Sequence, residues 1–377
     1  MLNMLNILTT ERAVLDKALP GFDDRLAELG TAAVEDPETH VIEEFREAGG
    51  GNVLIPVALG GGGLSCLEGA RLQRAVGSRA PSLAVASTMH HYKVAWLAHV
   101  LGDGAADVLA EIVGRRLLVS SCGAEGASGK QLFAPGIRVA AAKGGGLRLT
   151  GSKRPCSLVG SMGLLTLLAP GPPDSPYAGD LLIVMVPAET PGLRREPFWG
   201  NHALRAAQTD AVVLDDVFVP DHMIVPLGDP EQAAGRLNSL MARFLILITA
   251  AYVGIATGQV ERLFADGRGQ AGDRVTAFGP LETVSAAVEA VARELDDGTP
   301  EEALMGRILL VRYTAQRAIT EATDRVLELM GGMSFVRDGH GVDLLAASRA
   351  LAFHPPSEHT MREPLDAWLS GGELSLL

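Results

Sequence analysis

Apolar residues recur three and four positions apart over residues 10–111, where Ala, Leu, Glu and Arg are frequent and Gly and Pro fall mainly at breaks. This spacing gathers the apolar side chains on one face of a helix, so it predicts an α-helical N-terminal domain over residues 1–117. The same periodicity returns in segments 237–266, 281–295 and 301–330. Long amphipathic helices pack together, which predicts a C-terminal four-helix bundle over residues 229–377.

Between these two regions the pattern changes to short β-rich runs that are separated by turn residues. The runs occupy residues 117–121, 137–142, 147–153, 164–169, 181–187 and 211–220. Regularly spaced short strands are typical of a small barrel or sandwich, so we expect a middle β domain over residues 118–228. The fold class is therefore α+β, in the order helical, β, helical.

Composition then excludes several classes of function. Lys and Arg total 32 against 45 Asp and Glu, which gives a formal charge of −13. An acidic chain has no excess of positive charge to displace counterions from a phosphate backbone, so we expect no nucleic-acid partner. The three cysteines, Cys66, Cys122 and Cys156, form no short-spaced pair, which predicts neither a disulfide framework nor a metal site.

The N-terminal residues lack a basic leader followed by an apolar run and a small-residue cleavage site, so they do not resemble a secretory signal. The longest apolar run, residues 244–257, is shorter than the roughly 20 residues that cross a bilayer as a helix. We interpret it as a buried core helix and expect a cytoplasmic protein with no membrane partner.

Four local stretches, spread over nearly the whole chain, resemble the acyl-CoA dehydrogenase superfamily. They are an apolar-Pro segment at 54–56 that runs into the glycines at 60–63, a Gly-x-Lys strand end at 151–153, the segment 204–220 and the Gly331-Gly332 turn. The resemblance implies a flavoenzyme with FAD, in preference to FMN, extended between the β domain and the C-terminal bundle. It also implies a homodimer or homotetramer, because the adenosine end reaches a neighbouring subunit.

The resemblance also assigns the residues of the flavin site. Ser157 stands where the family has a hydroxyl at the flavin ring edge, and Ser121 begins the loop that surrounds the flavin. Arg268 is the counterpart of the phosphate-binding arginine, although Arg274 serves if the gap is placed differently. Gly331 and Gly332 form the turn beside the cofactor. The chain contains no GxGxxG or GxxxxGK[ST] motif, so neither a Rossmann site nor a P-loop is indicated.

The catalytic base of the family is missing from both of its usual positions. Desaturation of an acyl thioester needs a carboxylate to accept the α-proton while a hydride passes to the flavin. The two aligned positions hold Pro355 and Ala242, which accept no proton. Glu358, three residues after Pro355, is our candidate for a shifted catalytic base, and His354 is the other titratable neighbour.

Three functions follow from this departure. The first is a flavin-dependent oxidoreductase that acts on an acyl thioester, carried on coenzyme A or a carrier protein, with Arg243 as a substrate-binding residue. The second is a flavin monooxygenase that hydroxylates nitrogen or carbon, needs no base of this kind and requires a separate source of reduced flavin. There His91, with His90 and Tyr92, would line the substrate pocket. The third is a catalytically silent subunit of an active paralogue.

Overall fold

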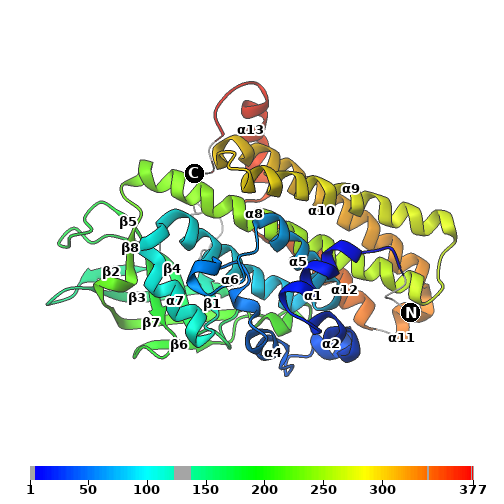
Figure 1. Ribbon diagram of the computed structural model, residues 1–377, viewed down its shortest axis with the longest axis horizontal. Helices are drawn as coiled ribbons and strands as arrows, with labels where there is room; N and C mark the ends of the chain where they lie inside the picture. Colours follow the sequence, from blue (N-terminus) through cyan, green and yellow to red (C-terminus); the bar gives the residue numbers. More distant parts are fainter. Residues whose placement is uncertain (1–4, 123–136, 338, 375, 377) are drawn as a thin grey trace.

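A computed structural model describes residues 5–122, 137–337, 339–374 and 376. The order helical, β, helical predicted from the sequence is confirmed, with two sheets on one side of the molecule and long helices on the other (Figure 1). The N-terminal helices are α1 (Thr9–Ala18), α2 (Phe22–Leu29), α3 (Thr31–Val34), α4 (Val41–Glu47), α5 (Cys66–Arg79), α6 (Pro81–Leu101) and α7 (Ala106–Arg115).

The strands form two four-stranded sheets, in the orders β1-β4-β5-β8 and β2-β3-β7-β6. All six predicted runs contain a strand, whereas β6, which is largely exposed, and β8, which is three residues long, were not predicted. The strands are β1 (Val119–Cys122), β2 (Arg138–Ala141), β3 (Leu147–Cys156), β4 (Leu164–Pro170), β5 (Leu181–Pro187), β6 (Leu193–Glu196), β7 (Asp210–Val219) and β8 (Ile224–Pro226).

Apart from Thr166, strands β4 and β5 consist of apolar residues, because both of their faces are buried. Leu165 and Leu167 on β4 point into the core between the two sheets, whereas Leu164 and Leu168 join the helical core. Side chains alternate along a strand, so Thr166 projects to the same side as Leu164 and Leu168, toward the helices. This alternation brings a hydroxyl to the boundary between the β domain and the helices.

The C-terminal part is built on α8 (Pro230–Ala265), α9 (Ala271–Asp296) and α10 (Glu301–Met330), followed by α11 (Gly332–Arg337), α12 (Gly339–Arg349), a short 3₁₀ turn (Ala350–Phe353) and α13 (Glu358–Leu369). Helix α8 starts earlier than predicted because the Asp229 side chain accepts hydrogen bonds from the amides of Glu231 and Gln232 and so caps the helix. Helix α9 also starts earlier than predicted, since it accommodates Pro280 within its length.

Helix α8 is the central helix of the molecule. It is long and apolar enough to cross a bilayer, but its apolar stretch is entirely buried inside the protein, as the sequence predicted for a core helix. Helices α5 and α8 approach each other closely through glycines. A Cβ atom on Gly254 would collide with the Arg74 carbonyl, and one on Gly258 with the Ser78 carbonyl. Small residues at this crossing therefore fix the N-terminal helices against the bundle.

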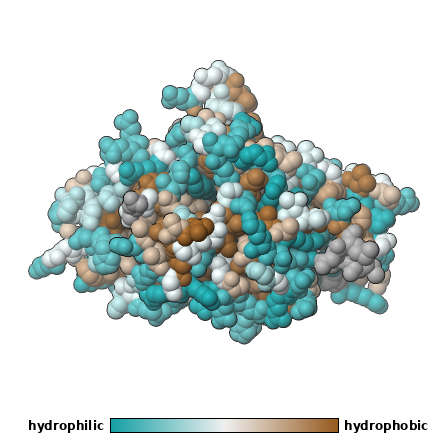
Figure 2. Space-filling view, viewed as in Figure 1, coloured by the Kyte–Doolittle hydropathy of each residue, from teal (hydrophilic) through white to brown (hydrophobic). Residues whose placement is uncertain are grey.

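The face of the molecule seen in Figure 2 is mainly hydrophilic, with apolar side chains in small groups near its centre. Single apolar groups on a surface are ordinary in a folded protein. The candidate functional site lies in the interior, where the β domain meets α6 and α8.

Candidate active site

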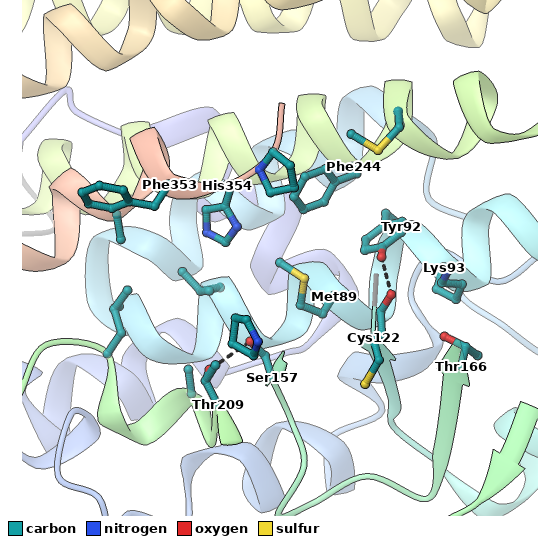
Figure 3. A pocket seen from close by; sticks show the side chains of 18 of the residues that line it. Met89, Tyr92, Lys93, Cys122, Ser157, Thr166, Thr209, Phe244, Phe353 and His354 are labelled. Carbon is teal, nitrogen blue, oxygen red and sulfur yellow. Dashed lines mark hydrogen bonds between the residues drawn. The ribbon is translucent and has the colours of Figure 1, made fainter. Parts of the chain in front are cut away.

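A cavity of about 270 Å³ lies between the β domain, helices α6 and α8, and the segment after α12 (Figure 3). Its described lining contains aliphatic and aromatic side chains, several hydroxyls, a histidine and a lysine, and no Asp or Glu. The main contributors are Val85, Met89, Tyr92 and Lys93 from α6, Ser121, Pro155, Ser157, Thr166 and Thr209 from the β domain, Leu240, Met241, Phe244 and Tyr252 from α8, and Phe353, His354 and Pro355 from the last segment.

Two serines predicted as flavin ligands lie together in the cavity wall. The Ser157 hydroxyl is 2.9 Å from the Thr209 hydroxyl, and the Ser121 hydroxyl is hydrogen-bonded to the Tyr92 hydroxyl. Each pair uses only one hydroxyl proton for its mutual bond, so each retains one proton to donate to a ligand. The rest of the loop that begins at Ser121, residues 123–129, lies outside the described residues.

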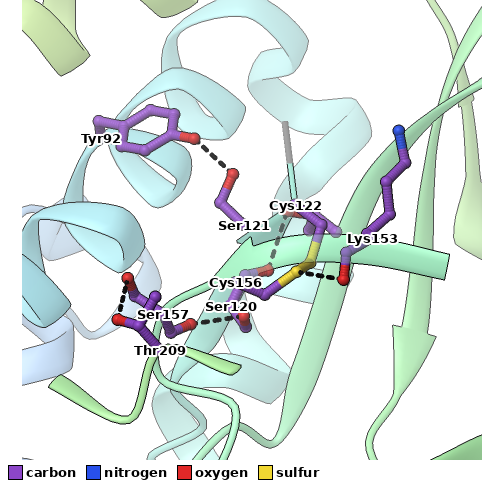
Figure 4. Close-up of a disulfide and its surroundings, with 9 residues drawn as sticks. Tyr92, Ser120, Ser121, Cys122, Lys153, Cys156, Ser157 and Thr209 are labelled. Carbon is purple, nitrogen blue, oxygen red and sulfur yellow. Dashed lines mark hydrogen bonds between the residues drawn. A yellow bond between two sulfur atoms is a disulfide. The ribbon is translucent and has the colours of Figure 1, made fainter. Parts of the chain in front are cut away.

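A disulfide joins Cys122 to Cys156 directly beside these serines (Figure 4). The prediction of no disulfide was therefore wrong. The two cysteines are 34 residues apart in the sequence, but β1 and β3 bring their Cα atoms to 5.2 Å in the apolar core between the sheets. Sequence spacing gave no sign of this contact, because it depends on how two strands from different sheets pack. The bond ties together the ends of the strands that present Ser121 and Ser157.

His354 and Tyr252 form a hydrogen-bonded pair in the cavity wall, with 3.0 Å between His354 Nε2 and the Tyr252 hydroxyl. Burial lowers the pKa of His354, and the nearby positive charge of Arg312 acts in the same direction, so that the pKa falls to about 3. Burial also raises the pKa of Tyr252. His354 is therefore a neutral imidazole and Tyr252 a protonated phenol at neutral pH, so the pair makes hydrogen bonds without carrying charge.

The predicted base Glu358 does not line the cavity. It is the first residue of α13, where its carboxylate pairs with Arg317 at 3.0 Å and its side chain is 35% exposed. Pro355, which occupies the family's usual base position, does line the cavity, and Ala242 is buried in α8. Because neither residue accepts a proton, the described wall offers no carboxylate for α-proton abstraction.

His90 and His91 are held in the protein core instead of the cavity wall. His91 Nδ1 accepts from the Gln73 amide, so Nε2 donates to the Gly50 carbonyl. His90 Nδ1 accepts from the Val119 amide and Nε2 donates to the Gly51 carbonyl. Burial lowers their pKa values, to about 3 for His90 and about 4 for His91. Because all four ring nitrogens are hydrogen-bonded, the two histidines hold the turn at Gly50 and Gly51 in place. The neighbouring Tyr92 lines the cavity instead.

Other predicted residues lie apart from the cavity. Arg243 turns away from it and binds Glu301 at 2.9 Å, which links α8 to α10. Arg268 is exposed in the turn after α8. Gly331 and Gly332 border a shallow surface depression next to the end of α10. The structure thus groups Ser121 and Ser157 in one cavity and separates them from these four residues.

No model of a protein family matches this chain. The chain is 33% identical to an isobutylamine N-hydroxylase from Streptomyces viridifaciens, over 98% of this chain and 99% of that protein. It is also 25% identical to a mitochondrial very long-chain specific acyl-CoA dehydrogenase from Macaca fascicularis, over 81% of this chain and 49% of that protein.

Among solved structures, KijD3 in complex with FMN and a dTDP-amino-keto-sugar superposes with a TM-score of 0.83 at 20% identity, over 97% of this chain and 95% of that chain. The shared fold and the full-length relative define the class of protein. The chain belongs to the acyl-CoA dehydrogenase superfamily and is a flavin-dependent oxidoreductase of that fold. Within the superfamily, its full-length relative is an amine N-hydroxylase.

Proposed function

We propose that the protein N-hydroxylates a small primary amine with molecular oxygen and a reduced flavin. This proposal rests on the absence of Asp and Glu from the described cavity lining, together with Pro355 and Ala242 at the two positions where the family has its base. Desaturation of a thioester requires a base there, whereas attack of an amine lone pair on activated oxygen does not. The full-length relative that hydroxylates isobutylamine supports the same choice.

The cavity suits an amine in its neutral form. Only an unprotonated amine has the lone pair that forms the new N–O bond. Burial of a cation without a nearby anion is unfavourable, so an apolar wall that lacks carboxylates lowers the pKa of a bound amine. The neutral His354 and Tyr252 orient such an amine by hydrogen bonds and leave its charge state unchanged.

The flavin fits the wall on the β-domain side. The free hydroxyl protons of the Ser157–Thr209 and Ser121–Tyr92 pairs are suited to the carbonyl and nitrogen edge of a flat ring, and apolar side chains from α8 would cover its other face. When bound and reduced, the flavin would supply two electrons which, with two protons, allow one oxygen atom of O₂ to be inserted into an N–H bond of the amine while the other leaves as water. A separate reductase supplies these electrons.

For the identity of the flavin, we infer FMN instead of the FAD expected from the sequence. The support is KijD3, which was solved with FMN and shares the fold over nearly its whole length. Arg268, Gly331 and Gly332 remain candidates for contact with the cofactor of a neighbouring subunit in a homo-oligomer. Mass spectrometry of flavin released from the purified protein, with titrations of FMN and FAD, distinguishes the two cofactors.

The decisive experiment supplies the protein with oxygen, NADH, a flavin reductase, FMN and a panel of small primary amines. We expect a hydroxylamine product that carries ¹⁸O when ¹⁸O₂ is used, and no product without the protein. Anaerobic bleaching of the oxidised flavin by an acyl thioester, with no hydroxylamine from any amine, would instead establish the thioester dehydrogenase. A protein that binds neither FMN nor FAD would be the silent subunit.

A further inference from the structure

Lys93 is a buried cation in the cavity wall that has no anionic partner among the residues the structure describes. It lies on α6, lines the cavity and is 5% exposed. Its ammonium group lies 5.2 Å from the centre of the Tyr92 ring and 6.0 Å from that of Trp96. Within the described part of the chain, no hydrogen bond or ion pair joins it. Aromatic faces offset only part of the cost of removing an ammonium group from water.

The surroundings of Lys93 are those expected of a binding site in which the ligand supplies the negative charge. The described lining contains no carboxylate that might balance its charge. Burial alone lowers the pKa of Lys93 to about 7, with no neighbouring charge contributing. An anion that entered the cavity would restore the ordinary charged state of the lysine. It would also gain a strong interaction, because few water molecules compete for either group.

Hydroxyl groups surround the same end of the cavity. Thr166 lines the cavity from β4, and Figure 3 shows Lys93 and Thr166 on one side of the view and Phe353 and Thr209 on the other. The Thr166 hydroxyl donates to the Ser120 carbonyl at 3.2 Å, and the free proton of the Ser121–Tyr92 pair serves the flavin position proposed above. The Lys93 ammonium itself carries three N–H donors, so it can bind both oxygens of a carboxylate. The rest of the described lining carries no charged side chain at neutral pH, which distinguishes this end of the cavity.

We propose that Lys93 binds an anionic group of the ligand, namely a carboxylate on an amine substrate. This proposal rests on the function proposed above and narrows it to amino acids whose carboxylate lies some distance from the reacting nitrogen. The Lys93 charge would also repel a substrate ammonium from this end, which favours the orientation with the nitrogen toward Ser157 and Thr209. An anionic part of the reduced flavin is the other group with the charge to bind Lys93.

The test uses the FMN-loaded protein and two probes of equal shape, isobutyrate and isobutyramide, which differ in charge. Isothermal titration measures both dissociation constants for the wild type and for Lys93→Met, Lys93→Arg and Lys143→Met. Lys143 is exposed on a turn, so its substitution makes the same charge change outside the cavity. Because a hydrogen bond to a charged group is lost, we expect Lys93→Met to weaken isobutyrate binding roughly 10- to 100-fold.

The same substitution leaves isobutyramide binding within about two-fold, and Lys93→Arg retains part of the preference for isobutyrate because it retains the charge. A wild-type protein that binds the two probes equally, or a Lys93→Met protein that keeps its preference, would overturn the carboxylate site. The affinity of each variant for reduced FMN, measured anaerobically, forms a second arm. Loss of that affinity alone assigns the bound anion to the flavin and overturns the substrate carboxylate.

These measurements do not require turnover, so they remain interpretable if no amine is hydroxylated. For a productive substrate, we compare propylamine with 4-aminobutanoate, which adds a carboxylate at the far end of the same chain. The wild type is expected to favour 4-aminobutanoate in kcat/KM, and Lys93→Met to lower the ratio of kcat/KM for 4-aminobutanoate to that for propylamine roughly 10-fold or more. Equal preference in both proteins would contradict the proposal. Lys93→Met is expected to fold, because methionine suits the apolar surroundings.

Discussion

Arg312 anchors the segment that carries His354 and Pro355 into the cavity wall. It lies on α10 with no exposed surface, and its guanidinium donates to the carbonyls of Leu351, His354 and Pro356. In Arg312→Met, the Pro356 carbonyl retains the Tyr313 hydroxyl at 3.1 Å. Among the described residues, Arg312 is the one donor to the His354 carbonyl, so this carbonyl loses its partner. The substitution therefore removes three bonds and leaves one buried carbonyl unsatisfied.

The expected loss in the free energy of unfolding is smaller than the summed contributions of the three hydrogen bonds. A hydrogen bond from a charged donor contributes about 1.5–3 kcal/mol, and an unsatisfied buried carbonyl costs about 1–3 kcal/mol. Removal of the buried guanidinium also recovers part of its desolvation cost. We therefore expect Arg312→Met to lower the free energy of unfolding by about 3 kcal/mol, measured by urea unfolding followed by tryptophan fluorescence.

Arg317→Met is the matched control, since Arg317 lies on the same helix but forms an exposed pair with Glu358. An exposed pair contributes about 0–1 kcal/mol, so the control is expected to change stability by no more than that. Arg312→Met should also weaken binding of a cavity ligand, because His354 and Pro355 lose their fixed positions. If both variants unfolded within about 1 kcal/mol of the wild type, the anchoring role of Arg312 would be refuted.

Three further predictions follow. Glu358→Gln is expected to leave kcat/KM for amine hydroxylation within about two-fold, because the carboxylate pairs outside the cavity; a loss above ten-fold would restore Glu358 as the base. The three buried histidines with lowered pKa values bind protons only after unfolding, so stability is complete above about pH 6.5 and falls by about 1.4 kcal/mol per histidine for each pH unit below it. Glu35, whose pKa burial raises to about 7, acts in the opposite sense, and urea unfolding at about pH 5.5 and 7.5 should still show a net loss at the lower pH; unchanged or greater stability there would contradict this. In denaturant without reductant, a thiol reagent should modify only Cys66, and all three cysteines after reduction; three reactive thiols at the start would rule out the disulfide.

The architecture could be predicted because each element carries its own period in the sequence. Helix α10 begins and ends where the pattern places it, at Glu301 and Met330. Strands β4 and β5 were recognisable as continuous apolar runs, which arise because both faces are buried. The failures were local. The Cys122–Cys156 bond depends on the packing of two sheets, and no spacing rule reports it.

Among the predicted site residues, Ser121, Ser157 and Tyr92 line the cavity, whereas Glu358, His91 and Arg243 do not. Ser121 and Ser157 lie at strand ends that reach the cavity, and both were found from the family resemblance. His91 illustrates the opposite case. A helix turns each successive side chain by about 100°, so neighbours in the sequence face different surroundings. His91 therefore meets the glycine turn, while Tyr92 beside it meets the cavity.

The position of Lys93 in the cavity wall follows directly from the sequence pattern of α6. Val85, Met89 and Lys93 follow one another at intervals of four positions, and Tyr92 lies three positions after Met89. These intervals place the four residues on one face of α6, and all four line the cavity. A lysine in register with an apolar stripe must be buried when that stripe is buried. Because burial of an unpaired ammonium group is costly, such a lysine persists where a ligand supplies the missing charge.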